Sequence, residues 1–375
     1  MYSKFIAPDH GLVDEVAGLA GFLNMAGSHL GHGGIPILDD LLREAMVDQS
    51  SQIVSPFGLI ELREKVAAKI TALYGHVYSP ESEVTITSGS NQAFYAAVAA
   101  FVGEGDEVLL FEPANDSYLP AILLNGGKPV YISLKEPDFH IDWEEVMRMI
   151  TSKTRMIIIN TPHNPTGMLL NELDMIRLQK IITGTRIVVL SDESFEHIVF
   201  DGLSHQSVSL YPKLAEKSIT VNSFNHTCQV PGWNIGYCVA PSIMMQEIRR
   251  VLKVMGAGVF IPFQKALAAV ISKKEIYQGL GKSYQEKRDF FATQMESTRL
   301  VPLPSFGTYY QLYSYKNISE DRDNDVAKRL INEFGVGAAP YSAFFHEKSK
   351  RALLRFNFSQ PNDVLAQVAE RLKNF

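Results

Sequence analysis

The sequence predicts an α/β protein in which a mostly parallel sheet of seven strands forms a large domain beside a smaller α+β domain. In the middle of the chain, short apolar runs alternate with helical patterns, and polar residues or glycines follow nearly every run. This alternation is typical of βαβ units, whose parallel strands are joined by helical crossovers. Near Tyr284 the pattern changes to mixed helices and strands. We therefore expect a large domain over residues 46–280 and a small domain made of residues 1–45 and 281–375.

Seven apolar runs are expected to form the strands of the large sheet. They span residues 84–87, 107–111, 128–132, 155–160, 186–191, 218–221 and 236–240, and an antiparallel direction is open for the last. A helix is expected over residues 92–101. Ligands of open α/β sheets bind beyond the carboxyl ends of the strands. The polar residues that follow the runs are therefore expected at one crevice: Ser88–Asn91, Asn115, Asn164, Asp192 and Ser223–His226.

The last third of the chain mixes both kinds of element. Helical patterns cover residues 284–298, 325–334 and 364–374, and a strand is expected over residues 352–357. We expect the first 45 or so residues to pack with this part of the chain.

Composition excludes several classes of function. The 375 residues are 46% hydrophobic and 20% charged, with a net charge of −6 and an isoelectric point near 6.0. This balance argues against partners such as nucleic acid or an anionic membrane. No apolar run approaches the roughly 18–20 residues of a membrane span, and the N-terminus lacks a signal-peptide pattern. Two cysteines are too few for a disulfide scaffold, so a cytoplasmic location is expected.

Three motifs occur in a specific order. TPHNPTG at residues 161–167 is followed by SDESFEH at 191–197 and by NSFNHTCQVPGWNIGYCVAP at 222–241. From about Gly21 to the C-terminus the chain resembles class I/II aminotransferases, which have the fold type I of pyridoxal phosphate (PLP) enzymes, and most of all the bacterial methionine/kynurenine-type members. The resemblance implies the two-domain plan above and a homodimer with its sites at the interface.

The resemblance also assigns roles at the crevice. Asp192 would pair with the pyridinium nitrogen of PLP, and Asn164 would bind its phenolic oxygen. Both residues also have structural readings, as a helix cap and as a turn residue. Ser90 and Asn91 at a helix N-terminus, together with Ser223, would contact the phosphate.

The chain departs from the family at the positions that matter most for the cofactor. His226 takes the place of the lysine that forms the Schiff base, and Asn234 takes the place of a cation that binds the phosphate. Phe195 replaces a tyrosine, Asn115 an aromatic residue that stacks on the ring, and Ile53 a tyrosine of the neighbouring subunit. A charge-assisted hydrogen bond contributes about 1.5–3 kcal/mol. Loss of the cation and of one tyrosine hydroxyl would therefore weaken PLP binding by roughly 30- to 1000-fold.

The remaining candidate residues concern the substrate. Arg355 matches the arginine that grips a substrate carboxylate, which suits the geometry of a guanidinium group. A surface arginine is the alternative. His29 and His32 lie in a glycine-rich segment, where they could contact substrate and line a pocket with His163 and His226. No metal-ligand spacing accompanies these histidines, so we expect no metal.

Three functions remain open. The first is an enzyme that acts on an amino-acid-like substrate in a biosynthetic pathway without lysine Schiff-base transamination. In it, His226 would be an acid/base group near neutral pH, Asp192 its electrostatic partner, and PLP weakly bound, non-covalent or lost. The second is a PLP- or pyridoxamine-phosphate-dependent enzyme in which His226 replaces the lysine as base. The third is a non-catalytic paralogue that binds a ligand or an active partner.

Overall fold

The computed structural model describes residues 21–27, 30–31, 34–47, 55–256, 258–347 and 351–375, and the account below concerns these residues. Ile53, His29 and His32 lie outside them.

A seven-stranded sheet forms the centre of the large domain, in the order β2-β8-β7-β6-β5-β3-β4. All neighbours are parallel except β8, which is antiparallel to β2 and β7. The strands are β2 (Val84–Thr87), β3 (Glu107–Glu112), β4 (Lys128–Ser133), β5 (Thr154–Asn160), β6 (Val188–Asp192), β7 (Ser218–Ser223) and β8 (Gly236–Val239). The predicted seven-stranded, mostly parallel sheet is confirmed.

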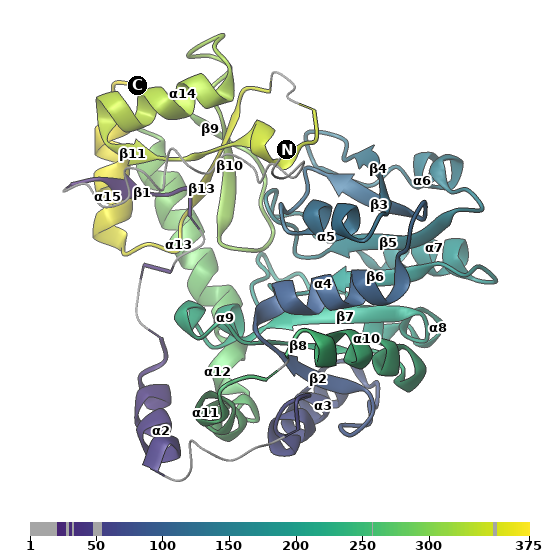
Figure 1. Ribbon diagram of the computed structural model, residues 1–375. Helices are drawn as coiled ribbons and strands as arrows, with labels where there is room; N and C mark the ends of the chain where they lie inside the picture. The colour runs from purple at the N-terminus through teal and green to yellow at the C-terminus, as the bar shows by residue number, and fades with distance from the viewer. Residues whose placement is uncertain (1–20, 28–29, 32–33, 48–54, 257, 348–350) are drawn as a thin grey trace, which may run out of the picture.

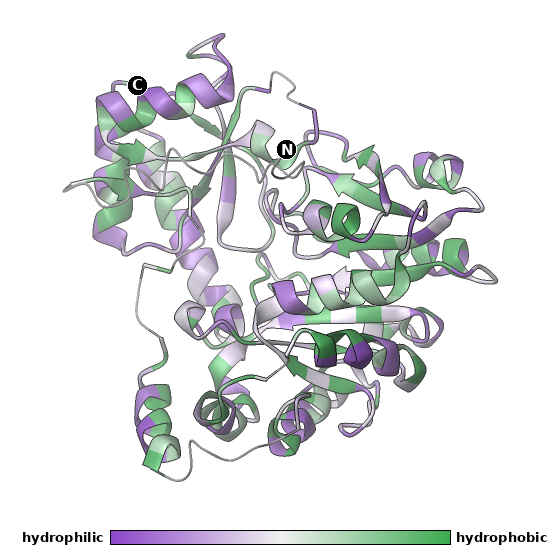
Figure 2. Cartoon of the chain, in the orientation of Figure 1, coloured by the Kyte–Doolittle hydropathy of each residue, from purple (hydrophilic) through white to green (hydrophobic). Residues whose placement is uncertain are grey.

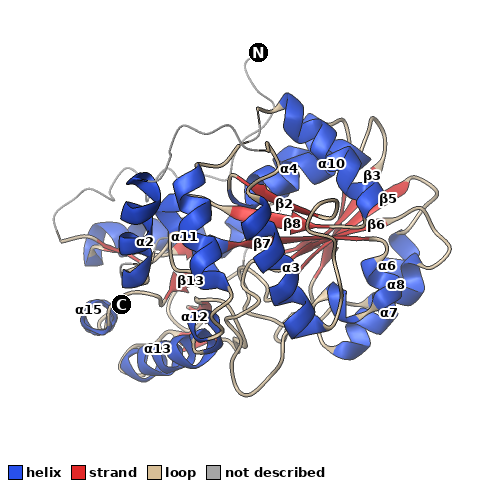
Figure 3. Cartoon of the chain, turned by 90° about the horizontal axis from the view of Figure 1, so that it is seen from below, coloured by secondary structure: helices blue, strands red, loops and turns tan. Residues whose placement is uncertain are grey.

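Helices cover both faces of this sheet (Figures 1 and 3). One face carries α4 (Gly89–Phe101), α5 (Tyr118–Leu124) and α10 (Ser242–Val254). The other carries α3 (Ile60–Tyr74), α6 (Trp143–Met149), α7 (Glu172–Ile182) and α8 (Pro212–Ala215). Because strand side chains alternate between faces, Ile157 and Ile158 of β5 join different apolar clusters. Figure 2 shows these apolar strands between amphipathic helices.

A second sheet, of four strands, lies in the C-terminal part. Its order is β12-β13-β10-β9, made by β9 (Val301–Pro302), β10 (Tyr310–Ser314), β12 (Ala339–Pro340) and β13 (Leu353–Asn357). The short β1 (Leu23–Asn24) pairs with β11 (Val336–Gly337). The helices here are α13 (Leu280–Met295), α14 (Asp323–Arg329), η3 (Leu330–Phe334), η4 (Tyr341–Phe344) and α15 (Asn362–Leu372). The division of the chain into domains at residues 45 and 280 stays a prediction.

The remaining described helices belong to neither of the groups above. They are α2 (Pro36–Val47), η1 (Val208–Leu210), α9 (Phe224–Thr227), η2 (Pro231–Trp233), α11 (Ile261–Ile271) and α12 (Glu275–Gln278). The amphipathic α2 packs on α11, away from the four-stranded sheet (Figure 1). None of the helices in the described part of the chain is both long and apolar enough to cross a membrane.

Several element boundaries differ from the expected ones by one to four residues. The strand expected from residue 186 begins at Val188, because the Arg186 carbonyl accepts a hydrogen bond of 2.8 Å from the Arg155 side chain. The helix expected over residues 325–334 is the α-helix α14, which continues into the π-helical turn η3 before Gly335. The register of buried residues is unaffected by either difference.

Candidate functional site

A cavity of about 570 Å³ opens at the carboxyl ends of the strands of the large sheet. Its lining includes all nine candidate residues that fall in the described segments: Ser90, Asn91, Asn115, Asn164, Asp192, Ser223, His226, Asn234 and Arg355. The parallel strands bring most of these residues together, as expected from the ends of β3, β5, β6 and β7. The strand β13 of the second sheet supplies Arg355.

His226 lies on α9, a short helix that directly follows β7. The Ser223 side chain caps this helix by accepting a hydrogen bond of 3.2 Å from the Asn225 amide. The imidazole stacks on the Phe195 ring at 4.3 Å, and its Nδ1 lies 3.3 Å from the Tyr309 hydroxyl. Burial lowers the pKa of His226 to about 4. His226 was expected to be an acid/base group near neutral pH. Its pKa in the structure lies well below 7, so the imidazole is neutral at pH 7.

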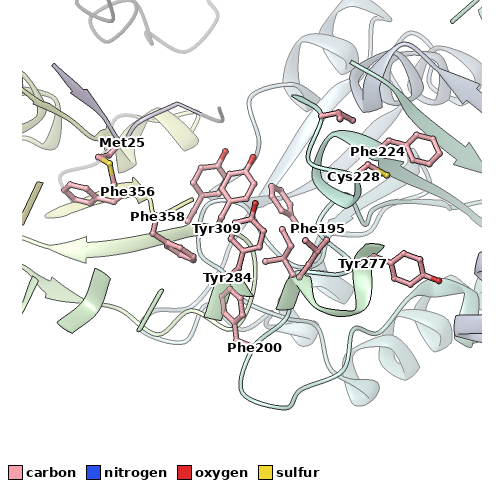
Figure 4. Packing of buried hydrophobic residues seen from close by; sticks show 14 of the residues in the cluster. Met25, Phe195, Phe200, Phe224, Cys228, Tyr277, Tyr284, Tyr309, Phe356 and Phe358 are labelled. Carbon is pink, nitrogen blue, oxygen red and sulfur yellow. The ribbon is translucent and has the colours of Figure 1, made fainter. Parts of the chain in front are cut away.

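Aromatic rings pack around His226, and two of them, Phe195 and Tyr309, lie side by side in Figure 4. Phe195 and Tyr309 meet edge to face at 5.2 Å. Tyr309 is fully buried and its hydroxyl is also hydrogen-bonded to the hydroxyl of Tyr310. Phe195 retains the bulk of a tyrosine, and its contacts are with these rings.

The N-terminus of α4 forms another wall of the cavity. Gly89 has φ +71°, and a Cβ there would lie 2.2 Å from Oδ1 of Asn234. Asn234 itself has left-handed backbone angles, φ 49° and ψ 54°, which asparagine tolerates better than most residues. An uncharged amide therefore packs directly on the first residue of α4, beside Ser90 and Asn91 in its first turn.

Asp192 is the last residue of β6 and is almost completely buried. Its Oδ2 accepts a hydrogen bond of 2.5 Å from the Tyr118 hydroxyl, and its Oδ1 accepts one of 3.0 Å from the Ser194 amide. Burial raises the pKa of Asp192, and these hydrogen bonds oppose the shift. The carboxylate is thus held in a fixed orientation at the cavity wall.

Arg355 is held by neutral groups. It donates hydrogen bonds of 2.8 Å to Oδ1 of Asn164 and of 2.6 Å to the Ala26 carbonyl. Its guanidinium lies over the Tyr310 ring at 3.9 Å and near the Phe344 ring at 4.8 Å. Burial lowers the pKa of Arg355, while Tyr310, Tyr309 and Asp116 act in the opposite direction. The reading of Arg355 as a surface residue is wrong, because its exposed fraction is 5%.

The cavity has few charged groups. In the described segments, the lining contains one permanently cationic side chain, Arg355. It also contains two acids, Asp116 and Asp192, and no lysine. The same segments contain no group of three histidine, cysteine, aspartate or glutamate residues that could hold a metal ion.

His163 is not part of the cavity lining, so the expected pocket shared by His163 and His226 is wrong. Its Nδ1 lies 2.8 Å from Oγ1 of Thr166 in the turn after β5, and burial lowers its pKa to about 3. His163 is a buried structural residue.

Sequence reasoning missed several residues of the site. They are Asn24, Asp116, Tyr310 and Phe344 in the lining, Tyr118 beside Asp192 and Tyr309 beside His226. Tyr118 lies in the sequence FEPANDSY at residues 111–118 and could have been recognised as a hydroxyl near the end of the strand expected over residues 107–111. Tyr309 and Tyr310 depend on the pairing of β10 with β13, which no local pattern reveals.

Comparisons with known proteins agree with this architecture. The sequence pattern of the family "Aminotransferase class I and II" matches residues 37–372. The methionine aminotransferase of Escherichia coli strain K12 is 38% identical over 337 residues, which cover 90% of this chain and 87% of the relative.

Two solved structures are also very similar. A methionine aminotransferase structure from Escherichia coli superposes with a TM-score of 0.96 at 35% identity, covering 100% of this chain and 99% of the other. The N-succinyldiaminopimelate aminotransferase of Mycobacterium tuberculosis has a TM-score of 0.92 at 29% identity, covering 97% and 95%. The chain therefore belongs to the class I and II aminotransferases.

Proposed function

We propose that this chain is an enzyme of the aminotransferase fold that acts on an amino-acid-like substrate without a lysine-bound cofactor. In this proposal His226 stands where relatives have the Schiff-base lysine and serves as the acid/base group. One observation carries the proposal: the cavity lining has an imidazole at residue 226 and, in the described segments, no lysine. An imidazole cannot form the imine that anchors PLP.

Pyridoxal phosphate, which aminotransferases of this family normally use, fits the lining poorly. Asn234, an uncharged amide, packs on Gly89 at the end where the resemblance places the phosphate, and Asn115 offers no aromatic ring for stacking. The one permanent cation of the described lining, Arg355, is engaged by Asn164 and Ala26. We therefore derive no step through this cofactor, and we propose that it is bound weakly or not at all.

Arg355 is the group that would bind a substrate carboxylate. Its Nε has no hydrogen-bond partner, although the residue is buried. A buried guanidinium without a carboxylate partner is costly, and an incoming carboxylate would lower that cost. The Tyr310 and Phe344 rings fix the plane of the guanidinium and exclude water from one side.

His226 would accept or deliver a proton at its Nε2. Tyr309 donates its hydroxyl hydrogen to Tyr310, because this hydrogen bond raises the pKa of Tyr309 and lowers that of Tyr310. The oxygen of Tyr309 then accepts from Nδ1–H of His226 in this proposal, which leaves the lone pair at Nε2. Negative charge arriving beside the ring raises the pKa of the imidazole from its buried value and strengthens it as a base. Burial is the cause of the lowered pKa in the structure, so this charge would come from the bound substrate, and the role of Asp192 as electrostatic partner stays a prediction.

We propose that the enzyme acts on a small molecule and is located in the cytoplasm. We propose a homodimer that takes a small amino-acid-like substrate within a biosynthetic pathway. Amino acids are also the substrates named for the similar proteins from Escherichia coli and Mycobacterium tuberculosis.

Replacement of His226 tests the function. The purified protein is incubated with an amino-acid panel that includes L-methionine, and products are detected by mass spectrometry. We expect His226→Ala to lower turnover by about 10²- to 10⁴-fold, the usual contribution of a general acid/base group. His140→Ala is the matched control, since His140 is exposed and far from the cavity lining. Full activity of His226→Ala sinks the proposal, and a protein without turnover that co-purifies with a lysine-bearing homologue is instead a binding paralogue.

A second candidate is an enzyme that uses PLP or pyridoxamine phosphate non-covalently. It is favoured by the presence of Asp192, Asn164 and the α4 N-terminus at the same cavity. Titration of the protein with each cofactor, followed by absorbance, tests it. A spectrum that equals the sum of protein and free cofactor at millimolar concentration ends this candidate.

A further inference from the structure

Two buried, oppositely charged residues line the same cavity, and neither forms an ion pair within the described part of the chain. The exposed fraction is 5% for Arg355 and 3% for Asp192. Burial of a charge is unfavourable, and an opposite charge would offset this cost more fully than the neutral hydrogen-bond partners that each group has in the described segments.

The described contacts of the Arg355 guanidinium are with neutral groups. Asn164 and the Ala26 carbonyl accept its two hydrogen bonds, two aromatic rings flank it, and Nε has no partner. Asp116 influences its pKa, but no carboxylate of the described segments forms an ion pair with it. The open requirement at this end of the cavity is an anion.

The described groups that contact the Asp192 carboxylate are neutral as well. A phenol hydroxyl and a backbone amide, of Tyr118 and Ser194, donate to its two oxygens. No lysine, arginine or histidine in the described part of the chain lies within ion-pair distance of it. The open requirement at this wall is a cation.

Arg355 and Asp192 form no direct ion pair, and a series of hydrogen bonds through Asn164 and Asn160 links the two residues. Arg355 donates to the Asn164 side chain, and the Asn164 amide donates to Oδ1 of Asn160 at 2.8 Å. Asn160 is the register partner of Asp192 on the neighbouring strand and donates to its carbonyl at 3.0 Å. A ligand that satisfies both residues must therefore carry its two charges on separate groups.

We infer that the cavity takes a ligand with a carboxylate at one end, bound by Arg355, and a cationic nitrogen at the far end, bound by Asp192. This chemical class includes ω-amino acids and basic amino acids. The inference rests on the proposed function, because a resident pyridinium would otherwise supply the cation at Asp192. Asp192 thereby becomes a residue that sets substrate specificity.

Two pairs of probes isolate the distant ammonium group. Hexanoate and 6-aminohexanoate differ by one terminal ammonium, and so do L-norleucine and L-lysine. In calorimetric titrations of the full-length protein without added PLP, we expect the terminal ammonium to strengthen binding by about 10- to 100-fold in both pairs, the effect of one charge-assisted hydrogen bond.

The Asp192→Asn variant should lose this gain and still bind hexanoate and L-norleucine, and that residual binding shows that the variant is folded. Asp116→Asn, which changes the other acid of the lining, should keep the gain. Equal binding within each pair, a gain that survives Asp192→Asn, or a gain that Asp116→Asn removes each overturns the inference. Failure of the proposed function would be detected by a separate measurement, because the mass spectrum of the same protein would then contain an adduct of PLP.

Discussion

Two regions of the molecule bury ionisable side chains in opposite ways. Between α3 and the large sheet, Lys69 and Glu196 form an ion pair. Both side chains are almost completely shielded from water. Tyr74 donates to Glu196 at 2.6 Å, and Lys69 donates to the Tyr237 hydroxyl at 3.0 Å. In the cavity, the comparably buried Arg355 has only neutral partners within the described chain.

This difference separates structural charges from those available to a ligand. A buried ion pair with its hydrogen bonds satisfied needs nothing further, and loss of one partner leaves an isolated charge. A buried charge with neutral partners and an orphaned donor has a requirement that only an incoming molecule fulfils. The experiments below test whether the two regions respond differently to the same kind of change.

The largest expected effect is on stability, at the ion pair. Lys69→Met should lower the free energy of unfolding by about 3–5 kcal/mol, because it leaves the Glu196 carboxylate buried without its cation. Urea denaturation measures the change. The exposed Lys153→Met is the matched control and should stay within about 0.5 kcal/mol of the parent protein. A loss below about 1 kcal/mol at Lys69 would mean that the pair is not structural.

The same type of substitution in the cavity should affect binding and leave the fold intact. Arg355→Met removes a buried cation that has no carboxylate partner, so we expect a stability change of at most about 1 kcal/mol. Affinity for hexanoate should fall by about 100-fold, equivalent to roughly 2.7 kcal/mol. Calorimetry and urea denaturation of the same sample give both numbers. A stability loss as large as that of Lys69→Met would erase the distinction between the regions.

Acid should weaken the structural pair in a defined window. Burial would raise the pKa of Glu196, but Lys69, His197 and Tyr74 outweigh it and lower the pKa from 4.5 to about 2. Since the folded pKa lies below the unfolded one, the stability from this group is present above pH 4.5 and is lost as pH falls towards 2. The slope is at most about 1.4 kcal/mol per pH unit for one proton.

Glu196→Gln isolates that contribution. The variant should lack this part of the pH slope, and the difference between its unfolding free energy and that of the parent should shrink between pH 4.5 and 2. A difference that does not change across this window contradicts the assignment of the slope to Glu196.

The smallest effect is expected at the hydroxyl beside His226. Tyr309→Phe removes the contact at 3.3 Å with Nδ1, which contributes about 1 kcal/mol, or roughly fivefold in turnover. Nitrogen NMR of labelled histidine reports which ring nitrogen carries the proton. We expect the fraction with the proton on Nδ1 to fall in the variant. An unchanged tautomer would show that Tyr309 does not position the ring.

Much of the large domain could be predicted from local patterns. The strands alternate with helices, and the residues at their carboxyl ends necessarily share one edge, which is why Asn164, Asp192 and His226 were found together. Contacts between distant parts of the chain could not be predicted in this way. Glu196 is 127 residues from Lys69, and no periodicity links them. The approach of Tyr310 to Arg355 likewise depends on the register of β10 against β13.

The expected differences from the family pattern at residues 226, 234, 115 and 195 could be identified from sequence. The contacts that these residues make in the fold could not. Nothing local showed that Asn234 packs on Gly89 or that Phe195 stacks on His226. Burial lowers the pKa of His226 to about 4, a consequence of packing that the residue type alone does not predict. The roles assigned to these residues stay proposals.

The central claim is that an aminotransferase cavity operates here without a lysine-bound cofactor. Incubation of the purified protein with PLP, reduction with borohydride and peptide mass spectrometry tests it most directly, because reduction makes any imine permanent. We predict no pyridoxyl group on a lysine of the cavity and no stoichiometric labelling of the protein. A single lysine labelled in stoichiometric amount would contradict the account, since a covalent anchor would then exist at a residue other than His226.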